Sequence, residues 1–148
     1  MQENTLPSFL LRAGGLVAGL LCAAASAQAQ DLTLQVCGIE QARGSLQIAA
    51  YQSAEQWLKQ AAWDKSWAIP ADAKGCVSLP LNGLPEGPLA FAVFQDLNQN
   101  GRLDTNAVGA PQEPFGFSRQ AIGNFGPPRF DQAVLAAPAG SVQRIELN

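Results

Sequence analysis

Residues 89–106 read LAFAVFQDLNQNGRLDTN and join an apolar segment directly to a polar loop. The segment 89–94 is apolar at every position, which is typical of a central β-strand covered on both faces. The loop has oxygen-bearing side chains at its first, third, fifth and ninth positions and glycine at its sixth: Asp96, Asn98, Asn100, Asp104 and Gly101. This spacing matches the first two thirds of an EF-hand-type calcium loop, in which alternate side chains turn towards one hard cation.

Calcium is therefore the cofactor that this loop predicts. We expect its ligands to be the four oxygen-bearing side chains, with the backbone carbonyl of Arg102 at the seventh position. The twelfth position holds Ala107 where an EF-hand has a bidentate Glu, and Glu113 could fold back to supply that group. With so few carboxylates, the expected dissociation constant is about 10⁻⁴ to 10⁻³ M.

Two other interpretations of the loop remain open. The first is an Asx-rich turn without a cation, in which Asn100-Gly101 is the tip of a hairpin. The second is a catalytic carboxylate pair, Asp104 with Glu113 or with Asp96. Carboxylates that alternate with Asn and Gly are better explained as ligands, so we expect a non-enzymatic protein.

The rest of the chain predicts an all-β fold. Residues 32–37 and 45–51 alternate apolar and polar side chains, and we expect these two strands to form a hairpin. Further strands are expected at 76–79, ending at Pro80, at 89–94 and at 141–147. Good helix formers at 54–62 follow a capping box, Ser53 with Gln56, and predict one short helix. Together these elements indicate an antiparallel β-sandwich of Greek-key type.

Aromatic residues gather in two places. Trp57, Trp63 and Trp67 lie close together in sequence, and we favour their covering the open edge of a sheet over their forming a platform for a sugar. The irregular stretch 107–131 is rich in Gly, Pro and Phe. Its four rings, with Arg129, could line a recognition groove, or the rings could pack as a lid on the core, and we favour the lid. These rings are Phe115, Phe117, Phe125 and Phe130.

The first 29 residues have the features of a secretory signal peptide. Arg12 precedes an apolar run, Ala13 to Ala25, and Ala27-Gln28-Ala29 is an A-x-A cleavage site. We therefore expect a periplasmic or secreted domain at 30–148. Cys37 and Cys76 are the cysteines that remain, and in an oxidising compartment they predict a disulfide, with two buried free thiols as the alternative.

Composition narrows the possible functions. The net charge is −3, and no basic run is present, which argues against nucleic acid as a partner. No second apolar span follows the leader, so no membrane span is expected in the mature chain. The chain has no histidine, which removes Ser-His-Asp and Cys-His catalysis and the commonest ligand of transition metals.

Three ordered motifs resemble those of a bacterial family of unknown function, DUF2141. They are D-x-N-x-N-G-x-x-D at 96–104, G-x-P-x-E-x-[FY]-G-F-S at 109–118 and F-G-x-P-x-F-x-x-A at 125–133. The resemblance implies export and a sandwich similar to prealbumin and to carboxypeptidase regulatory domains. It also places Glu113 in the same signature as the loop, but it implies no activity.

The sequence thus predicts an exported, non-enzymatic β-sandwich in which calcium orders a Gly/Pro/Phe-rich surface for binding a protein or glycan. Two alternatives are a structural or accessory domain with a purely stabilising cation, and a carbohydrate-binding module that uses the tryptophans.

Overall fold

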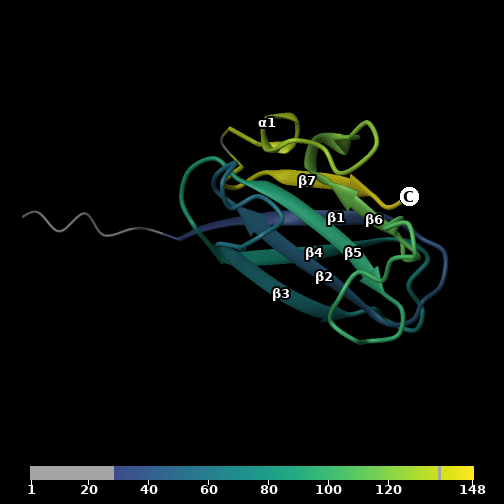
Figure 1. The fold of residues 1–148 in the computed structure, drawn as a ribbon. Helices are drawn as coiled ribbons and strands as arrows, with labels where there is room; N and C mark the ends of the chain where they lie inside the picture. Colours follow the sequence, from purple (N-terminus) through teal and green to yellow (C-terminus); the bar gives the residue numbers. More distant parts are fainter. Residues whose placement is uncertain (1–28, 137) are drawn as a thin grey trace, which may run out of the picture.

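The computed structural model describes residues 29–136 and 138–148, so the predicted signal peptide, except Ala29, lies outside the described residues. Seven strands form two sheets (Figure 1). The first sheet has the order β4-β1-β7 and the second the order β3-β2-β5-β6. The strands are β1 (Gln30–Ile39), β2 (Ser45–Tyr51), β3 (Trp63–Ala68), β4 (Gly75–Leu84), β5 (Ala90–Asp96), β6 (Phe115–Phe117) and β7 (Val142–Glu146).

The main core lies between the two sheets. Alternating side chains of β1 and β2 point into it, so the period-2 pattern of these segments is explained by one buried face each. Its fully buried members include Leu34, Leu46, Leu81, Phe91 and Ile145, which come from both sheets. β5 lies between β2 and β6, and its residues are buried or half-buried throughout, which confirms the expectation of a central, twice-covered strand.

The strand partners differ from those expected. β1 and β2 lie in different sheets, so the predicted hairpin is wrong: β1 pairs with β4, and β2 pairs with β3 and β5. β7 runs parallel to β1, so the fold is not entirely antiparallel. β4 also continues through Pro80 to Leu84, because Pro80 lies in a strand that pairs on one side only.

The two sheets meet on one side and are open on the other. On the β6–β7 side, Phe115 and Asn148 exchange backbone hydrogen bonds of 3.3 and 3.0 Å. Gly116 permits this approach, because a Cβ there would collide with the carbonyl oxygen of Glu146. On the open side, Trp63 and Trp67 of the edge strand β3 pack against the main core. They belong to the edge strand itself and close this side of the core, whereas the prediction had a short helix cover the edge.

The helix expected at 54–62 does not form, and this segment is a series of turns. Its capping contact is present, since the Gln56 N–H donates to Ser53 Oγ at 3.4 Å. Leu58 then takes a positive φ of 57°, which ends the turn, and Trp57 is buried in a second apolar cluster. The structure instead has one short α-helix, α1 (Phe130–Ala133), and a 3₁₀ turn, η1 (Ser118–Gln120).

Cys37 and Cys76 are cross-strand partners on β1 and β4. Their sulfurs are 2.05 Å apart, which is a disulfide distance. Among the described residues, no helix is long and apolar enough to cross a membrane.

Candidate functional site

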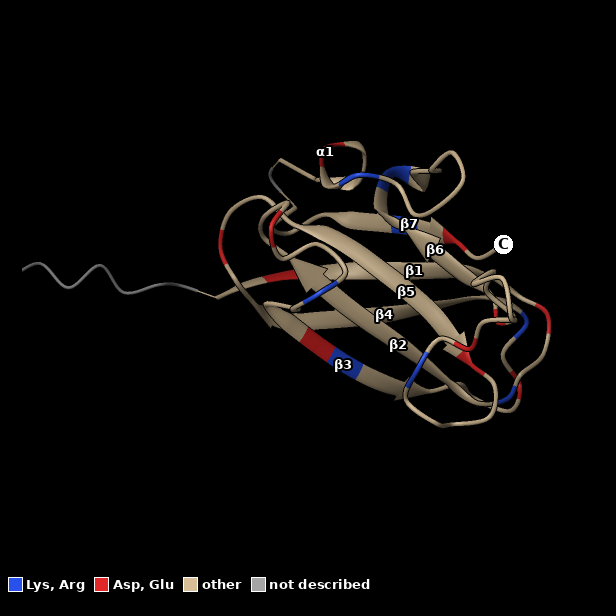
Figure 2. Cartoon of the chain, in the orientation of Figure 1, with Lys and Arg blue, Asp and Glu red and all other residues tan. Residues whose placement is uncertain are grey.

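The predicted loop begins where β5 ends, at Asp96. This side chain is completely buried, and its carboxylate accepts the backbone N–H groups of Asn100 at 3.1 Å and Gly101 at 2.7 Å. Gly101 has a φ of 75°, so the expectation that the sixth position needs glycine is confirmed. Figure 2 shows acidic residues, coloured red, at this end of β5. The first position of the loop is therefore a buried acceptor that fixes the turn.

Asn98, Asn100 and Asp104 converge beyond this turn. The Asn98 and Asn100 side-chain amides donate to the two carboxylate oxygens of Asp104, at 2.6 and 2.9 Å. The Asn98 amide oxygen accepts the backbone N–H of Asn100 at 3.2 Å, and the Asn100 amide oxygen accepts the backbone N–H of Arg102 at 2.8 Å. Three of the predicted ligands thus share one centre, and Arg102 is exposed beside them.

Glu113 folds back onto the loop, as expected from the missing twelfth ligand. Its carboxylate accepts the N–H of Leu97 at 2.8 Å and the N–H of Asp104 at 3.0 Å. Glu113 is buried, so this bridge fixes both ends of the loop at once. Residues 96–113 therefore form one hydrogen-bonded unit. The end of β5 and the segment that returns to it at Glu113 bring the six predicted residues together.

The donor set fits a cation in part. Amide nitrogens face Asp104, because each amide oxygen accepts a backbone N–H, so turning an amide oxygen towards Asp104 would break that hydrogen bond. The carboxylates of Asp96 and Glu113 bind backbone N–H groups but have further lone pairs. Within residues 29–136 and 138–148, no group of three or more His, Cys, Asp or Glu side chains is arranged to hold a metal.

The loop carboxylates lie outside the ion pairs of the described chain. Those pairs are Arg129–Asp131 at 2.9 Å and Arg144–Glu146 at 3.0 Å. Asp96, Asp104 and Glu113 therefore form a local concentration of negative charge that no lysine or arginine within the described residues neutralises by an ion pair. A cation would be attracted to such a site.

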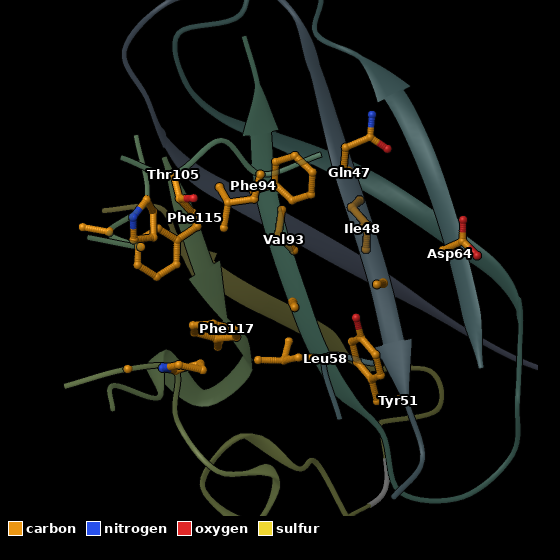
Figure 3. A pocket seen from close by; sticks show the side chains of 18 of the residues that line it. Gln47, Ile48, Tyr51, Leu58, Asp64, Val93, Phe94, Thr105, Phe115 and Phe117 are labelled. Atoms are coloured by element: carbon orange, nitrogen blue, oxygen red, sulfur yellow. The ribbon is translucent and has the colours of Figure 1, made fainter. Parts of the chain in front are cut away.

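One wall of a groove is formed by the same loop (Figure 3). The groove lies across the outer face of the sheet β3-β2-β5-β6 and has a volume of about 810 Å³. Its wall at this end includes Leu103, Thr105 and Val108, and its opposite rim includes Leu58 and Phe125. Its floor is formed by outward side chains of the four strands, among them Gln47, Ala49, Tyr51, Asp64, Ala92, Phe94, Phe115 and Phe117.

The aromatic residues divide between groove and cores. Phe115, Phe117 and Phe125 line the groove, and Phe125 is fully exposed at its rim. Phe117 and Phe130 also pack against the second apolar cluster, so the rings are divided between the groove lining and this cluster, and recognition at the groove stays a prediction. Arg129 pairs with Asp131 outside the groove lining.

The tryptophans do not contribute to the lining of this groove. Trp57 is buried in the second cluster, where its Nε1–H donates to the carbonyl oxygen of Pro128 at 2.7 Å. Trp63 and Trp67 lie on the inner side of β3, with ring centroids 6.4 Å apart. The Lys65 ammonium lies 4.5 Å from the Trp67 ring centroid. This placement supports a covering role.

Sequence reasoning missed two features of the site. The outward positions of β2 and β5, Ala49, Tyr51, Ala92 and Phe94, are apolar, and this second apolar stripe could have indicated a groove. It also missed Ser118, whose buried hydroxyl accepts the N–H of Phe91 at 2.8 Å and donates to the carbonyl oxygen of Ala133 at 2.6 Å. Ser118 thereby ties β5 to α1 beside the groove.

Comparison with known proteins gives one family. Searches of curated proteins and of solved structures found no match. The family described as "Uncharacterized protein conserved in bacteria (DUF2141)" matches residues 34–146, which include both sheets, the loop and the groove. The chain therefore belongs to the DUF2141 family.

Proposed function

We propose that the protein is a non-enzymatic, exported binding protein whose loop binds calcium and thereby shapes a ligand groove. The observation that carries this proposal is the convergence of Asn98 and Asn100 on the Asp104 carboxylate, at the edge of the groove. Oxygen donors on a flexible loop are the ligands that calcium prefers. Magnesium is less suited, because it requires a nearly ideal octahedral arrangement.

The ligands would divide into two groups. Asn98, Asn100 and Asp104 would hold the cation directly, after the two amides turn their oxygens inwards and give up the backbone N–H groups that they accept without a cation. Asp96, Glu113 and the Arg102 carbonyl would complete the set, while the two carboxylates keep their backbone hydrogen bonds. Because few carboxylates are involved, the expected dissociation constant is about 10⁻⁴ M, in the range of extracellular modules.

Calcium would act on the groove through the loop. Leu103 and Thr105 flank the Asp104 position and line the groove wall. A cation bound at Asp104 would restrict the backbone of this wall further, in addition to the hydrogen bonds that the Asp104 backbone makes with Glu113 and Gln112. A more rigid wall loses less entropy when a ligand binds.

We further infer a Greek-key, prealbumin-like sandwich located in the periplasm or outside the cell. The chain crosses from one sheet to the other between β1 and β2, β3 and β4, β4 and β5, and β6 and β7, and this order supports the topology. The A-x-A site at Ala27-Gln28-Ala29 and the paired Cys37 and Cys76 support export into an oxidising compartment.

Thermal unfolding of residues 30–148 in EDTA and in about 1 mM calcium tests the calcium site. Mass action at a dissociation constant of about 10⁻⁴ M predicts about 1.4 kcal/mol of stabilisation, a rise of several degrees. Asp104→Ala should abolish the rise, and Asp72→Ala, which changes an exposed carboxylate in another loop, should retain it. If the melting temperature of the wild type does not rise with calcium, the calcium site is rejected and the loop is a polar turn without a cation.

A structural or accessory domain with a purely stabilising cation is the second candidate. The closed set of hydrogen bonds around Asp96 and Glu113 favours it, because this set stabilises the loop whether or not the groove is used. Calcium binding without any ligand in the groove would support this candidate. Glycan binding that is lost in Trp63→Ala would instead support a carbohydrate-binding module.

A further inference from the structure

The groove changes in polarity from one end to the other. Figure 3 shows Asp64 on the edge strand β3 at one end, with Phe115 and Phe117 at the other. Tyr51 and Phe94 lie between these ends, on β2 and β5. A ligand that fills the groove would therefore meet a carboxylate first and then a series of aromatic rings.

Asp64 is the only charged side chain among the described residues that line the groove. It is absent from the ion pairs found within residues 29–136 and 138–148. Burial, and then the negative charge of Asp64, raise the pKa of the Tyr51 hydroxyl, which agrees with the carboxylate acting across the groove floor. The electrostatic complement of this lining is a single positive charge, whereas an anionic ligand would be repelled.

The size of the groove suits a small molecule. Its volume of about 810 Å³ falls within the usual range for ligand sites, about 300–1,000 Å³. It crosses four strands, which at about 4.8 Å per strand spacing gives a length of about 14 Å. Aromatic walls with a few polar groups at defined positions are typical of sites for drug-sized ligands.

We propose that the groove binds a small organic cation: an amine whose ammonium group lies at Asp64 and whose apolar body packs on Phe94, Phe115 and Phe117. The aromatic rings contribute by burying the apolar body, while the carboxylate of Asp64 attracts the charge. The proposal deepens the function proposed above, since it rests on the groove being the binding site and names the ligand class.

Dansylcadaverine is a suitable probe, because it joins an aromatic body to a primary amine by a flexible chain. Its fluorescence is titrated with the protein in calcium, beside the neutral N-acetyl derivative and an anionic dansyl amino acid. At low ionic strength the amine should bind about fivefold more tightly than the neutral derivative, the upper range for an exposed ion pair. This preference should decrease at high salt, because salt screens the charge interaction, and this can be measured on the wild type alone.

Three variants locate the interaction. Asp64→Asn should abolish the preference for the amine while the neutral derivative binds as before. Asp72→Asn removes the same charge from an exposed position outside the groove and should keep the preference. Phe94→Ala should weaken the binding of both probes, because it removes a ring from the groove floor.

Equal binding of amine and neutral derivative to the wild type would overturn the proposal, as would a preference that survives Asp64→Asn or high salt. Tighter binding of the anionic probe would also overturn it. Thermal unfolding with and without calcium is measured on the same samples. A calcium-dependent rise without amine preference rejects the ligand class alone, whereas the absence of that rise rejects the calcium site.

Discussion

The outer faces of the two sheets differ in character. The face of β4-β1-β7 is polar, with Gln35 between Ser78 and Arg144 on adjacent strands and the cysteine pair Cys37–Cys76 at its end. The face of β3-β2-β5-β6 has Ala49, Tyr51, Ala92 and Phe94 at its centre. The outer face of β4-β1-β7 is suited to contact with water, whereas the outer face of β3-β2-β5-β6 is suited to contact with other apolar groups.

The cover of the second face is incomplete. At one end, the turns of 52–62 and α1 enclose a second apolar cluster built around Trp57. At the other end lies the loop that follows Asp96, and the groove remains between them. Four of the five exposed large apolar side chains of the described chain are at the rim of this groove or beside it: Leu58, Val108, Ile122 and Phe125. The fifth, Val142, lies elsewhere. This contrast supports the proposal that the apolar face holds the binding site.

Trp57→Ala should have the largest effect, because it removes the centre of the covered end. The Trp57 ring lies 5.0 Å from that of Tyr51 and 6.0 Å from that of Phe130, and its exposed fraction is 8%. We expect a loss of about 4 kcal/mol in the free energy of unfolding, measured by urea denaturation. Trp63→Ala, on the half-buried edge, should cost about 2 kcal/mol. A smaller loss of stability for Trp57→Ala than for Trp63→Ala would contradict the central place of Trp57 in the second cluster.

Removal of the cysteine pair tests the polar face. The double variant Cys37→Ala/Cys76→Ala should lower the free energy of unfolding by about 3 kcal/mol, because the unfolded chain is no longer constrained. The calcium-dependent rise in melting temperature should persist, since the pair lies on the opposite sheet from the loop. Loss of that rise would show that the two faces are not independent.

Glu113→Gln should cost about 2 kcal/mol, because one of the two backbone N–H groups, of Leu97 or Asp104, would then face an amide NH₂. Glu86→Gln is the matched control: Glu86 is exposed, and its replacement should change stability by less than about 0.5 kcal/mol. Chemical denaturation in EDTA separates this effect from any contribution of calcium. Equal stability of the two variants would argue against the bridge.

The titration of Tyr51 gives the smallest effect. Burial first, and the charge of Asp64 second, raise its pKa above the usual value of about 10. The unfolded chain therefore loses this proton at lower pH than the native protein. Stability should be unaffected below pH 10 or so and should fall as the pH rises through the native pKa.

Tyr51 is the only tyrosine, so its ionisation is read directly from the near-ultraviolet absorbance of tyrosinate. Asp64→Asn should lower the pKa, and Tyr51→Phe should reduce the loss of stability at alkaline pH. An unchanged pKa in Asp64→Asn would mean that the carboxylate does not act on the groove floor.

The apolar run 89–94 and the alternation of 45–51 were sufficient to predict β5 and β2, because burial on both faces leaves a continuous apolar run and burial on one face leaves an alternation. Their partners were not predictable in the same way. Alternation specifies which face of β1 is buried but not which strand lies beside it, and β4 is distant in sequence. The predicted hairpin was wrong for this reason.

The prediction of a helix at 54–62 was wrong for another reason. Ser53 caps a first turn as its sequence predicts, but burial of Trp57 beneath Pro128 outweighs the helix propensity of the residues that follow. In the site, the side-chain spacing from Asp96 to Asp104 predicted the convergence of three residues and the return of Glu113. The groove was missed because its lining comes from four strands, whose adjacency no local pattern encodes.

The parallel pairing of β7 with β1 has a consequence for biosynthesis. β1 begins at Gln30 and β7 at Val142, so the sheet β4-β1-β7 cannot be completed until nearly all of this sequence has left the ribosome. Pairings between such distant segments form slowly, because a long loop must close before they gain stability. Completion of this sheet is therefore a late step in the synthesis of the chain, a property that agrees with the export proposed above.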